Sequence, residues 1–469
     1  MTPPLGVVPD ATVVLVTRAP AAWDTGLVST TPESSEALSP TSRVVDPAGS
    51  APDVLVELEI GRIAHGGHCV ARHEGRVVFV RHTLPGETVR ARLTDSGETS
   101  KFWRADAVEI LVASPDRVRS AWPQAGADGV GGGELAHVAL EAQRRWKAGV
   151  VEEQLSRLAK IDREVVVEPA PGDDERGGLG WRTRIDLVAD ADGRAGMRQF
   201  RSHDVLPLNT MPLASAEVLA AAGAEKIFAK RWTPGAEIEI VAPADGSDAI
   251  VLLDGQVLRN GHLDTRPNVR RSVSETITVD GEEISYRVAA DGFWQVHREA
   301  PSLLAQVVLD AARGGADGDL TDATVVDLYS GAGLFTVPLA KAVGQVGRVV
   351  AIEGDERAVK DARRNAHAFE QVELHVGQVD QVLRTAGHGA IAGADVVVLD
   401  PPRTGAGAKT IAQIVALSPS RIVYVACDPA ALARDIAYLA KDGYELESVR
   451  AFDLFPMTHH VECVAVLTR

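Results

Sequence analysis

The last third of the chain, from about residue 325, alternates short apolar stretches with stretches of helical pattern. The first five apolar stretches are rich in Val, Ile and Leu and are five or six residues long. Alternation of this kind favours a parallel, doubly wound α/β sheet with helices on both faces. The last two stretches are joined by a short loop, which predicts an antiparallel hairpin that closes the sheet. The expected strands are Val325–Tyr329, Arg348–Glu353, Val372–Val376, Asp395–Asp400, Arg421–Ala426, Tyr444–Asp453 and Val461–Leu467.

Three further segments precede this α/β region. Residues 1–50 contain seven prolines and a Ser/Thr/Glu-rich run, so we expect mostly disorder there, with Thr12–Val16 as one apolar patch. Residues 53–115 carry short alternating strands between glycine turns, the pattern of a small β-barrel. Residues 120–295 combine a helical stretch, Leu135–Ala159, with antiparallel strands, so we expect a central α+β domain before a doubly wound domain at 296–469.

The composition limits the class of protein. The formal net charge is −17, which argues against nonspecific coating of nucleic acid, because such binding depends on neutralising phosphates. A local RNA site is compatible with this global average. No apolar stretch approaches the length of a membrane span, and the start lacks the pattern of a secretory signal. The three cysteines, Cys69, Cys427 and Cys463, are too few for a disulfide framework, so we expect a cytoplasmic protein.

A glycine turn follows the first strand of the α/β region. The sequence Asp327–Thr336 places Gly331 and Gly333 between a strand and a helix, and Glu353 ends the next strand twenty residues after Gly333. Glycines let the backbone approach a ligand, and an acid at that spacing can accept hydrogen bonds from ribose hydroxyls. The pattern fits a nicotinamide dinucleotide, S-adenosylmethionine or a purely structural turn. Thr336 stands where a dinucleotide site has its third glycine, and the closing hairpin favours a methyltransferase.

Two more groups follow strands whose carboxyl ends should meet at one sheet edge. Asp400-Pro-Pro-Arg403 follows one strand, and its two prolines stiffen the loop that holds Asp400 and Arg403. Cys427 follows the next strand and precedes a helix that Pro429 can start, and a helix N-terminus stabilises a thiolate. The simple alternatives are a surface turn for the first group and a small buried side chain for the second. Their shared position favours a function.

An acid begins the last apolar strand. Glu462 ends the segment Phe455-Pro-Met-Thr-His-His-Val-Glu462 and lies at the same predicted edge. An acid in an apolar strand favours a function over the alternative of a satisfied edge residue. His459 and His460 have no supporting ligand cluster, so we expect positioning groups and no metal site.

These residues suit methylation at C5 of uracil. C5 is not nucleophilic enough to attack a methyl sulfonium, whereas addition of a thiolate at C6 makes the ring enolate-like. A base must then remove the C5 proton so that the thiolate can leave. The sheet edge offers one candidate for each role, Cys427 as the thiol and Glu462 as the base.

Four motifs in this order carry a family resemblance. Asp327–Ala340, DPPR at 400–403, ACDPAALARDI at 426–436 and FPMTHHVE at 455–462 resemble the RNA 5-methyluridine methyltransferase family of class I, S-adenosylmethionine-dependent enzymes. Val54–Val112 resembles the TRAM domain, a small OB-like RNA-binding β-barrel common in this family. The resemblance covers nearly everything after the first fifty residues. It implies S-adenosylmethionine as cofactor and rRNA or tRNA as partner, with no membrane and no obligate protein partner.

The resemblance also implies roles for individual residues. Cys427 matches the nucleophile and Glu462 the proton acceptor, while Gln295 matches a glutamine that contacts the methyl donor. Arg403 and His460 are expected to position the substrate. The other residues expected at the donor site are Tyr329, Gly331, Gly333, Glu353, Gln378 and Asp400. Leu334 replaces a residue that is often Asn, so a contact there would come from its backbone.

The chain departs from the family pattern in one respect. Several relatives hold a four-iron cluster with four cysteines before and within the central domain. The corresponding positions here, in Trp122–Gly133 and at Met211-Pro-Leu, contain no cysteine. The resemblance therefore predicts no iron–sulfur cluster, with packing alone holding this region.

Two other functions are alternatives to this one. A catalytically idle RNA-binding protein would use only the barrel, and the retained Cys427, Glu462, Asp400 and Gln295 argue against it. An NAD-dependent oxidoreductase would use the glycine turn for a dinucleotide, and Thr336 together with the closing hairpin argues against that alternative.

Overall fold

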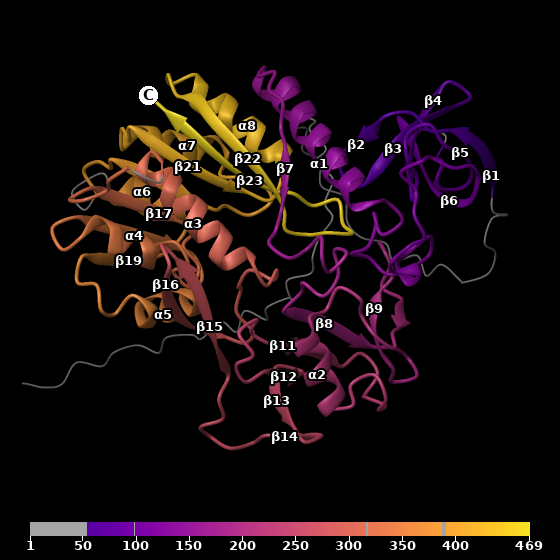
Figure 1. Ribbon diagram of the computed structural model, residues 1–469, viewed down its shortest axis with the longest axis horizontal. Coiled ribbons are helices and arrows are strands. Elements are labelled where there is room, and N and C mark those ends of the chain that lie inside the picture. Colours follow the sequence, from indigo (N-terminus) through magenta and orange to yellow (C-terminus); the bar gives the residue numbers. More distant parts are fainter. Residues whose placement is uncertain (1–53, 98, 316–317, 387–390) are drawn as a thin grey trace, which may run out of the picture. The chain divides into compact units, whose positions relative to one another are not determined.

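The computed structural model describes residues 54–97, 99–315, 318–386 and 391–469 (Figure 1). The expected disorder of residues 1–50 and the patch Thr12–Val16 lie outside these ranges. Within them, the strands form sheets of six, seven, two and eight strands. Every helix in the described ranges is too short or too polar to cross a bilayer.

The six-stranded sheet occupies the region predicted as a small barrel. Its core is built by alternate side chains, such as Val56, Leu58 and Ile60, which are 8%, 2% and 4% exposed. The strand order is β1-β5-β6-β4-β3-β2. Strand pairing among the described residues does not join β1 to β2, so the expected barrel is not closed. The strands are β1 Leu55–Glu59, β2 Ile63–Ala64, β3 His68–His73, β4 Arg76–Arg81, β5 Thr88–Asp95 and β6 Phe102–Val112.

The described part of the central region contains four helical segments and a seven-stranded antiparallel sheet of order β10-β9-β8-β11-β12-β13-β14. Helix α1 begins at Leu140, five residues after the predicted start, because Gln143 Nε2 donates to the carbonyls of Leu135 and Val138 and holds that stretch as a turn. The elements are η1 Pro123–Ala125, α1 Leu140–Gln154, η2 Leu155–Ala159, β8 Arg184–Ala189, β9 Ala195–Arg198, β10 Val205–Pro207, α2 Ala216–Ala224, β11 Glu237–Val241, β12 Ile250–Leu253, β13 Gln256–Arg259 and β14 His262–Leu263.

Apolar packing holds the glycine-rich segment Trp122–Gly133. Trp122 is 1% exposed and belongs to one hydrophobic core with Ala125 and Val130. The backbone N–H of Val130 donates to Gln124 O at 2.9 Å, which folds the glycine-rich stretch back on itself. A Cβ at Gly133 would come within 3.0 Å of the Trp122 ring, so the absence of a side chain allows this close approach.

The eight-stranded sheet confirms the doubly wound prediction. Its order is β19-β18-β17-β20-β21-β23-β22-β7, and β21, β23 and β22 pair antiparallel as the closing hairpin. A separate hairpin, β15 with β16, packs beside α3 and α5. The elements are β15 Ser272–Val279, β16 Glu282–Ala289, α3 Ala300–Arg313, β17 Thr324–Leu328, α4 Thr336–Val343, β18 Arg348–Glu353, α5 Glu356–Asn365, β19 Val372–Val376, α6 Val379–Ala386, β20 Val396–Leu399, α7 Gly407–Ala416, β21 Arg421–Ala426, α8 Pro429–Ala440, β22 Glu445–Asp453 and β23 Glu462–Thr468.

Successive side chains of the parallel strands enter two different cores. Val325 and Val396 pack with α3 and α4, whereas Val326 and Val397 pack with α7 and α8. This period of two explains why the strands read as continuous apolar runs, since both faces of the sheet are covered.

One strand of this eight-stranded sheet, β7 Val167–Pro169, precedes the α/β region in the sequence. It pairs parallel with β22, and Figure 1 shows it in magenta alongside the yellow hairpin. Val151 of α1 and Leu155 of η2 are buried in the core of the same sheet. A three-residue strand gave no usable periodic pattern, so the sequence prediction missed it.

A buried ion pair joins α1 to the end of β22. Lys147 Nζ donates to Asp453 Oδ1 at 2.5 Å and to the carbonyl of Phe455 at 3.0 Å. Both charged side chains are almost completely buried, at 0% and 1% exposure. Burial lowers the pKa of Lys147, and the charge of Asp453 opposes that effect. Either charge, buried without the other, would raise the free energy of the folded state, so the stability of the fold requires both.

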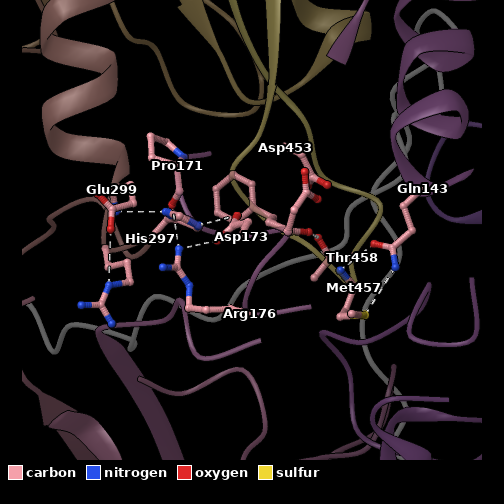
Figure 2. Close-up of polar contacts among 12 residues, drawn as sticks. Gln143, Pro171, Asp173, Arg176, His297, Glu299, Asp453, Met457 and Thr458 are labelled. Atoms are coloured by element: carbon pink, nitrogen blue, oxygen red, sulfur yellow. Dashed lines mark hydrogen bonds and ion pairs between the residues drawn. The ribbon is translucent and has the colours of Figure 1, made fainter. Parts of the chain in front are cut away.

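Gln143, one turn before Lys147, holds the loop that leads into β23. Its Oε1 accepts the N–H of Met457 at 2.8 Å, and its Nε2 lies 3.4 Å from the Met457 sulfur (Figure 2). Met457 has a left-handed backbone, with φ of 69°. Helix α1 thus determines the path of the loop that ends at Glu462.

Lys147→Met should destabilise the protein by about 3–5 kcal/mol, because buried Asp453 would lose its hydrogen-bonded cation and keep only Arg144 Nε, 3.9 Å away. Urea denaturation followed by tryptophan fluorescence measures this loss. Lys360→Met, which changes an exposed lysine of α5, should stay within about 0.5 kcal/mol of the parent. Lys147→Met/Asp453→Leu should recover part of the loss. A loss of only about 1 kcal/mol, as for an exposed pair, would contradict the interpretation.

Candidate active site

The carboxyl ends of the parallel strands meet at one edge of the eight-stranded sheet. Leu328, the last residue of β17, pairs with Ile352 of β18 on one side and with Leu399 of β20 on the other. The strand order reverses here, and doubly wound sheets bind ligands at such a switch point. Tyr329, Glu353, Asp400 and Cys427 are the residues at these strand ends.

The antiparallel strand β23 brings Glu462 to the same edge. Ala426 of β21 pairs with Cys463 of β23. Because β23 runs in the opposite direction, Glu462, the residue before Cys463, lies opposite Cys427. Glu462 is 4% exposed, and Cys427 is partly buried. The two residues predicted to perform the chemistry are therefore neighbours across one strand pair.

The glycine turn leaves space above its backbone. Tyr329, Gly331 and Gly333 have φ angles of 62°, 55° and 91°, in the left-handed region that favours glycine. A Cβ at Gly331 would meet nothing within 4 Å. The Gly331 N–H donates to Glu353 Oε2 at 2.9 Å, and the Asp355 N–H donates to Glu353 Oε1 at 2.8 Å. Glu353 is thus held rigidly at the mouth of the turn.

Two buried polar atoms beside this turn have no partner among the described residues. They are Ser330 Oγ and Asp327 Oδ1, while Asp327 Oδ2 accepts from Thr336 Oγ1 at 2.5 Å. Buried polar atoms normally find a hydrogen-bond partner. An open turn, a fixed carboxylate and these unpartnered atoms fit a nucleoside-bearing ligand such as S-adenosylmethionine.

The site crowds acidic groups together. Burial, followed by the nearby carboxylates of Asp327 and Glu353, raises the pKa of Asp400 to about 7. Burial also raises the pKa of Asp327 to about 7. Burial and the charge of Asp400 raise the pKa of Glu462 well above its usual range, and Arg403 opposes this effect. Few negative charges can therefore coexist here without a cation.

Cys427 differs from the sequence prediction in its electrostatics. We expected the N-terminus of α8 to favour the thiolate, but burial and then the carboxylates of Glu462 and Asp400 raise the pKa of the Cys427 thiol. Arg403 acts in the opposite direction. The resting residue is therefore a thiol, because desolvation and like charges outweigh the helix end.

Arg403 and His460, predicted to position the substrate, lie together. Arg403 Nη2 is 3.3 Å from His460 Nε2, so a neutral imidazole accepts the bond from the guanidinium. Burial lowers the pKa of His460 well below its usual value, and this agrees with the neutral form. The His459 and His460 rings are 4.1 Å apart, and His459 Nδ1 lies 3.6 Å from the buried carboxylate of Glu134.

Gln295 and Gln378 make no hydrogen bond to these groups among the described residues. Gln378 is exposed beside the turn after β18, where a Cβ at Gly354 would lie 3.7 Å from Gln378 Nε2. Gln295 is 9% exposed. His297, two residues later, is fixed by Asp173 Oδ2 at 2.9 Å from its Nε2 (Figure 2).

A second anchor ties the Gln295 segment to the glycine turn. Trp294 packs against Tyr286 with ring centroids 5.2 Å apart, and the Tyr286 hydroxyl donates to Leu334 O at 3.0 Å. The backbone carbonyl of Leu334 accepts this bond, which ties the hairpin of β15 and β16 to the segment that follows the glycine turn.

Some residues of the site escaped the sequence analysis. Asp327 begins the glycine-turn motif, and its position at a strand end is a usable signal for a site residue. Glu134, beside His459, and His65, whose Nε2 lies 3.3 Å from Asp428 Oδ2 next to Cys427, come from distant segments. No local pattern connects such residues to the site.

Three family models match parts of the chain. The tRNA (uracil-5-)-methyltransferase model matches residues 392–469, and the TRAM domain model matches residues 52–108. A model of RNA cap guanine-N2 methyltransferase matches residues 322–412. The first of these spans Asp400, Cys427 and Glu462.

Curated relatives match over most of the chain. An uncharacterized RNA methyltransferase of Bifidobacterium longum is 43% identical over 431 residues, covering 88% of this chain and 96% of that one. Another from Streptomyces avermitilis is 44% identical over 433 residues, covering 88% and 97%. The chain belongs to the RNA 5-methyluridine methyltransferase family. It is an S-adenosylmethionine-dependent RNA methyltransferase, as the resemblance predicted.

A solved structure shares the fold of this methyltransferase. The tRNA (uracil-54, C5)-methyltransferase of Pyrococcus abyssi, in complex with S-adenosyl-L-homocysteine, is 22% identical with a TM-score of 0.60. The match covers 87% of this chain and 99% of that one. It supports the class I sheet and the N-terminal TRAM domain as the fold of the methyltransferase.

The raised pKa of Asp400 predicts a cost in stability at neutral pH. The folded methyltransferase keeps a proton on Asp400 up to about pH 7, whereas the unfolded chain does so only up to about pH 4. Stability due to this group therefore falls as the pH rises from about 4 to about 7.

Asp400→Asn removes this titration. The thermal midpoint of Asp400→Asn minus that of the parent should increase by at least about 2 °C between about pH 4 and pH 7. Above pH 7 this difference should stay constant. Differential scanning calorimetry at several pH values measures the difference. Asp442→Asn changes an exposed acid of the same domain and should give a flat difference. A flat difference for Asp400→Asn as well would argue against the crowded site.

Proposed function

We propose that this methyltransferase methylates C5 of a uridine in RNA through a covalent bond between Cys427 and C6 of the base. The observation that carries the proposal is the pairing of Ala426 with Cys463, which sets Cys427 opposite Glu462 at the edge that also bears Asp400. The family model and the Pyrococcus abyssi enzyme both name tRNA. A tRNA is therefore the first substrate to test, before rRNA.

The residues proposed to hold S-adenosylmethionine lie around the glycine turn. Glu353 would accept hydrogen bonds from the ribose, and the backbone at Gly331 and Gly333 would allow close approach. Gln295 and Gln378 are proposed as further contacts, as the resemblance implies. When bound, S-adenosylmethionine supplies an electrophilic methyl group and the positive charge of its sulfonium.

Asp400 is proposed as the base that activates the thiol. With a pKa of about 7 it is partly ionised near neutral pH, so it can take the proton of Cys427. The sulfur then bonds to C6, and the electrons of the C5–C6 double bond make C5 nucleophilic. Arg403, held by His460, would balance negative charge on the adduct.

Glu462 is proposed to complete the reaction after C5 has been methylated. Its ionised carboxylate accepts the C5 proton, the double bond reforms, and the bond from C6 to sulfur breaks. Arg403 favours the ionised form of Glu462, and a bound cation would act in the same direction. Asp400 returns its proton to Cys427, and Glu462 releases the C5 proton to solvent, so that both the thiol and the base are restored.

We also propose a division of labour along the chain. Residues 53–115 would bind RNA, residues 120–295 would support both neighbours, and residues 296–469 would perform methyl transfer. A cytoplasmic location fits an enzyme that acts on RNA and depends on a free thiol.

Glu462→Gln should stall the reaction after methyl transfer, because Gln keeps the shape of Glu but is a far weaker base. RNA should then remain attached to the enzyme through Cys427. A denaturing gel with labelled RNA and S-adenosylmethionine should show a slow band for Glu462→Gln and none for Cys427→Ala/Glu462→Gln. Turnover of Glu462→Gln at the parental rate would mean that another group accepts the proton.

Glu353→Ala should weaken binding of S-adenosylmethionine by about 1.5–3 kcal/mol, the loss of a charged hydrogen bond. Isothermal titration calorimetry measures the change. Glu353→Gln retains an acceptor for the Gly331 N–H and separates the loss of charge from a shift of the turn. Glu356→Ala, an exposed acid three residues away, should bind like the parent. Unchanged affinity in Glu353→Ala would remove Glu353 from the donor site.

A further inference from the structure

One face of the six-stranded sheet displays aromatic rings and guanidinium groups toward the central region. On β4 and β6 the side chains of Val78, Val80 and Ala105 point into the core. The alternate positions Phe79, Phe102 and Arg104 point the other way and are only partly buried. Phe79 and Phe102 meet edge to face at 5.3 Å, and the Arg104 guanidinium lies 4.8 Å from the Phe102 ring centroid.

A loop of the central region, residues 199–203 between β9 and β10, adds two more side chains to this face. The Arg81 guanidinium of β4 lies 3.7 Å from the centroid of the Phe200 ring, and the Arg201 guanidinium lies 5.3 Å from it. The Phe200 N–H donates to Gly129 O at 3.1 Å, so the loop is held by the glycine-rich segment. Arg201 is exposed and has a left-handed backbone, with φ of 55°.

We name this set the Arg201 surface. It consists of Phe79, Arg81, Phe102, Arg104, Phe200 and Arg201.

The charges of the Arg201 surface are only partly balanced. Arg81 makes a two-pronged bond with Asp106, at 2.7 and 2.5 Å, and Arg104 lies 2.9 Å from Asp95. Across the described part of the chain, no carboxylate is bonded to Arg201. Burial and the nearby charges of Arg104 and Arg81 lower the pKa of Arg201. A local positive potential thus exists on a chain with a net charge of −17.

A continuous series of contacts leads from the Arg201 surface to the reaction centre. His68 pairs with Arg81 across β3 and β4. A Cβ at the adjacent Gly67 would lie 3.2 Å from the Cβ of His459. The His459 ring packs at a tilt of 42° against His460, which contacts Arg403, so the series ends at the pair proposed to position the substrate.

We propose that the Arg201 surface binds the single-stranded nucleotides that flank the target uridine, with Arg201 and Arg104 on phosphates and Phe102 as a stacking platform. The inference rests on the proposed function and adds a contribution from the central region to RNA binding. Single-stranded RNA is the partner that offers both an anion for the guanidinium groups and flat bases for the rings. An acidic protein segment would satisfy only the charge.

The test uses the full chain and a fluorescein-labelled 20-nucleotide single-stranded RNA with a central uridine, titrated by fluorescence anisotropy at several salt concentrations. Arg201→Ala should weaken binding about 5- to 10-fold and reduce the slope of log K against log salt by about 0.7, the value for one lost phosphate contact. Arg201→Lys should keep the slope. The matched control, Arg231→Ala, changes an exposed arginine of the same region and should leave both quantities unchanged.

Arg231 suits this control because it lies in the connection between α2 and β11, which contacts the other end of β9. The N–H of its neighbour Trp232 donates to Gly193 O at 2.8 Å, at the opposite end of β9 from residues 199–203. Calorimetry with S-adenosylmethionine should give parental affinity for every variant. That result would separate loss of RNA contact from loss of fold.

Two outcomes would overturn the inference. One is an Arg201→Ala variant with the parental affinity and salt slope for the RNA. The other is that Arg201→Ala weakens competition by polyglutamate but leaves binding of the RNA unchanged. That result would indicate an acidic protein partner. Failure of the proposed function would appear separately, as the absence of 5-methyluridine, measured by mass spectrometry, in RNA treated with the parental enzyme.

Discussion

The antiparallel pairing of β23 with β21 is the constraint on which the candidate active site depends. A strand that ran parallel at this position would carry Glu462 to the far edge of the sheet, away from Cys427. Because β23 runs antiparallel to β21, its first residue, Glu462, lies opposite Cys427, the residue that follows β21. The loop before β23 must then follow a defined path, and Gln143 and Lys147 of α1 hold that path through Met457 and Asp453. The distant helix therefore helps to shape the candidate active site.

Crowded acids are the second physical theme of this edge. Burial and mutual repulsion raise the pKa of Asp327, Asp400 and Glu462, and the same effects keep Cys427 protonated. Such a cluster raises the free energy of the folded chain, because each further negative charge opposes the others. The arrangement fits a ligand that brings a positive charge. Strain in the backbone at Tyr329 is a further local cost at the same place.

Much of the fold followed from local pattern. Strands buried on both faces have a near-continuous apolar signature, and Arg348–Glu353, Val372–Val376 and Arg421–Ala426 were predicted with the bounds that the structure has. Helix ends were less well predicted, as at Leu140, because side-chain bonds to a preceding turn decide where α1 begins. The short β7 was missed because three residues carry no period. The TRAM region was predicted as a barrel, whereas its strand ladder stays open.

The sequence by itself determined which chemical groups are present and at which strand ends they stand. Chain order and the rule that parallel strands share an edge were enough to group Tyr329, Glu353, Asp400 and Cys427. Only the tertiary structure decided how these groups behave. The protonated state of Cys427, the Arg403–His460 contact and the joining of Phe200 to Arg81 all depend on segments far apart in the chain. Burial and Coulomb interactions act through space, so no local pattern of residues encodes them.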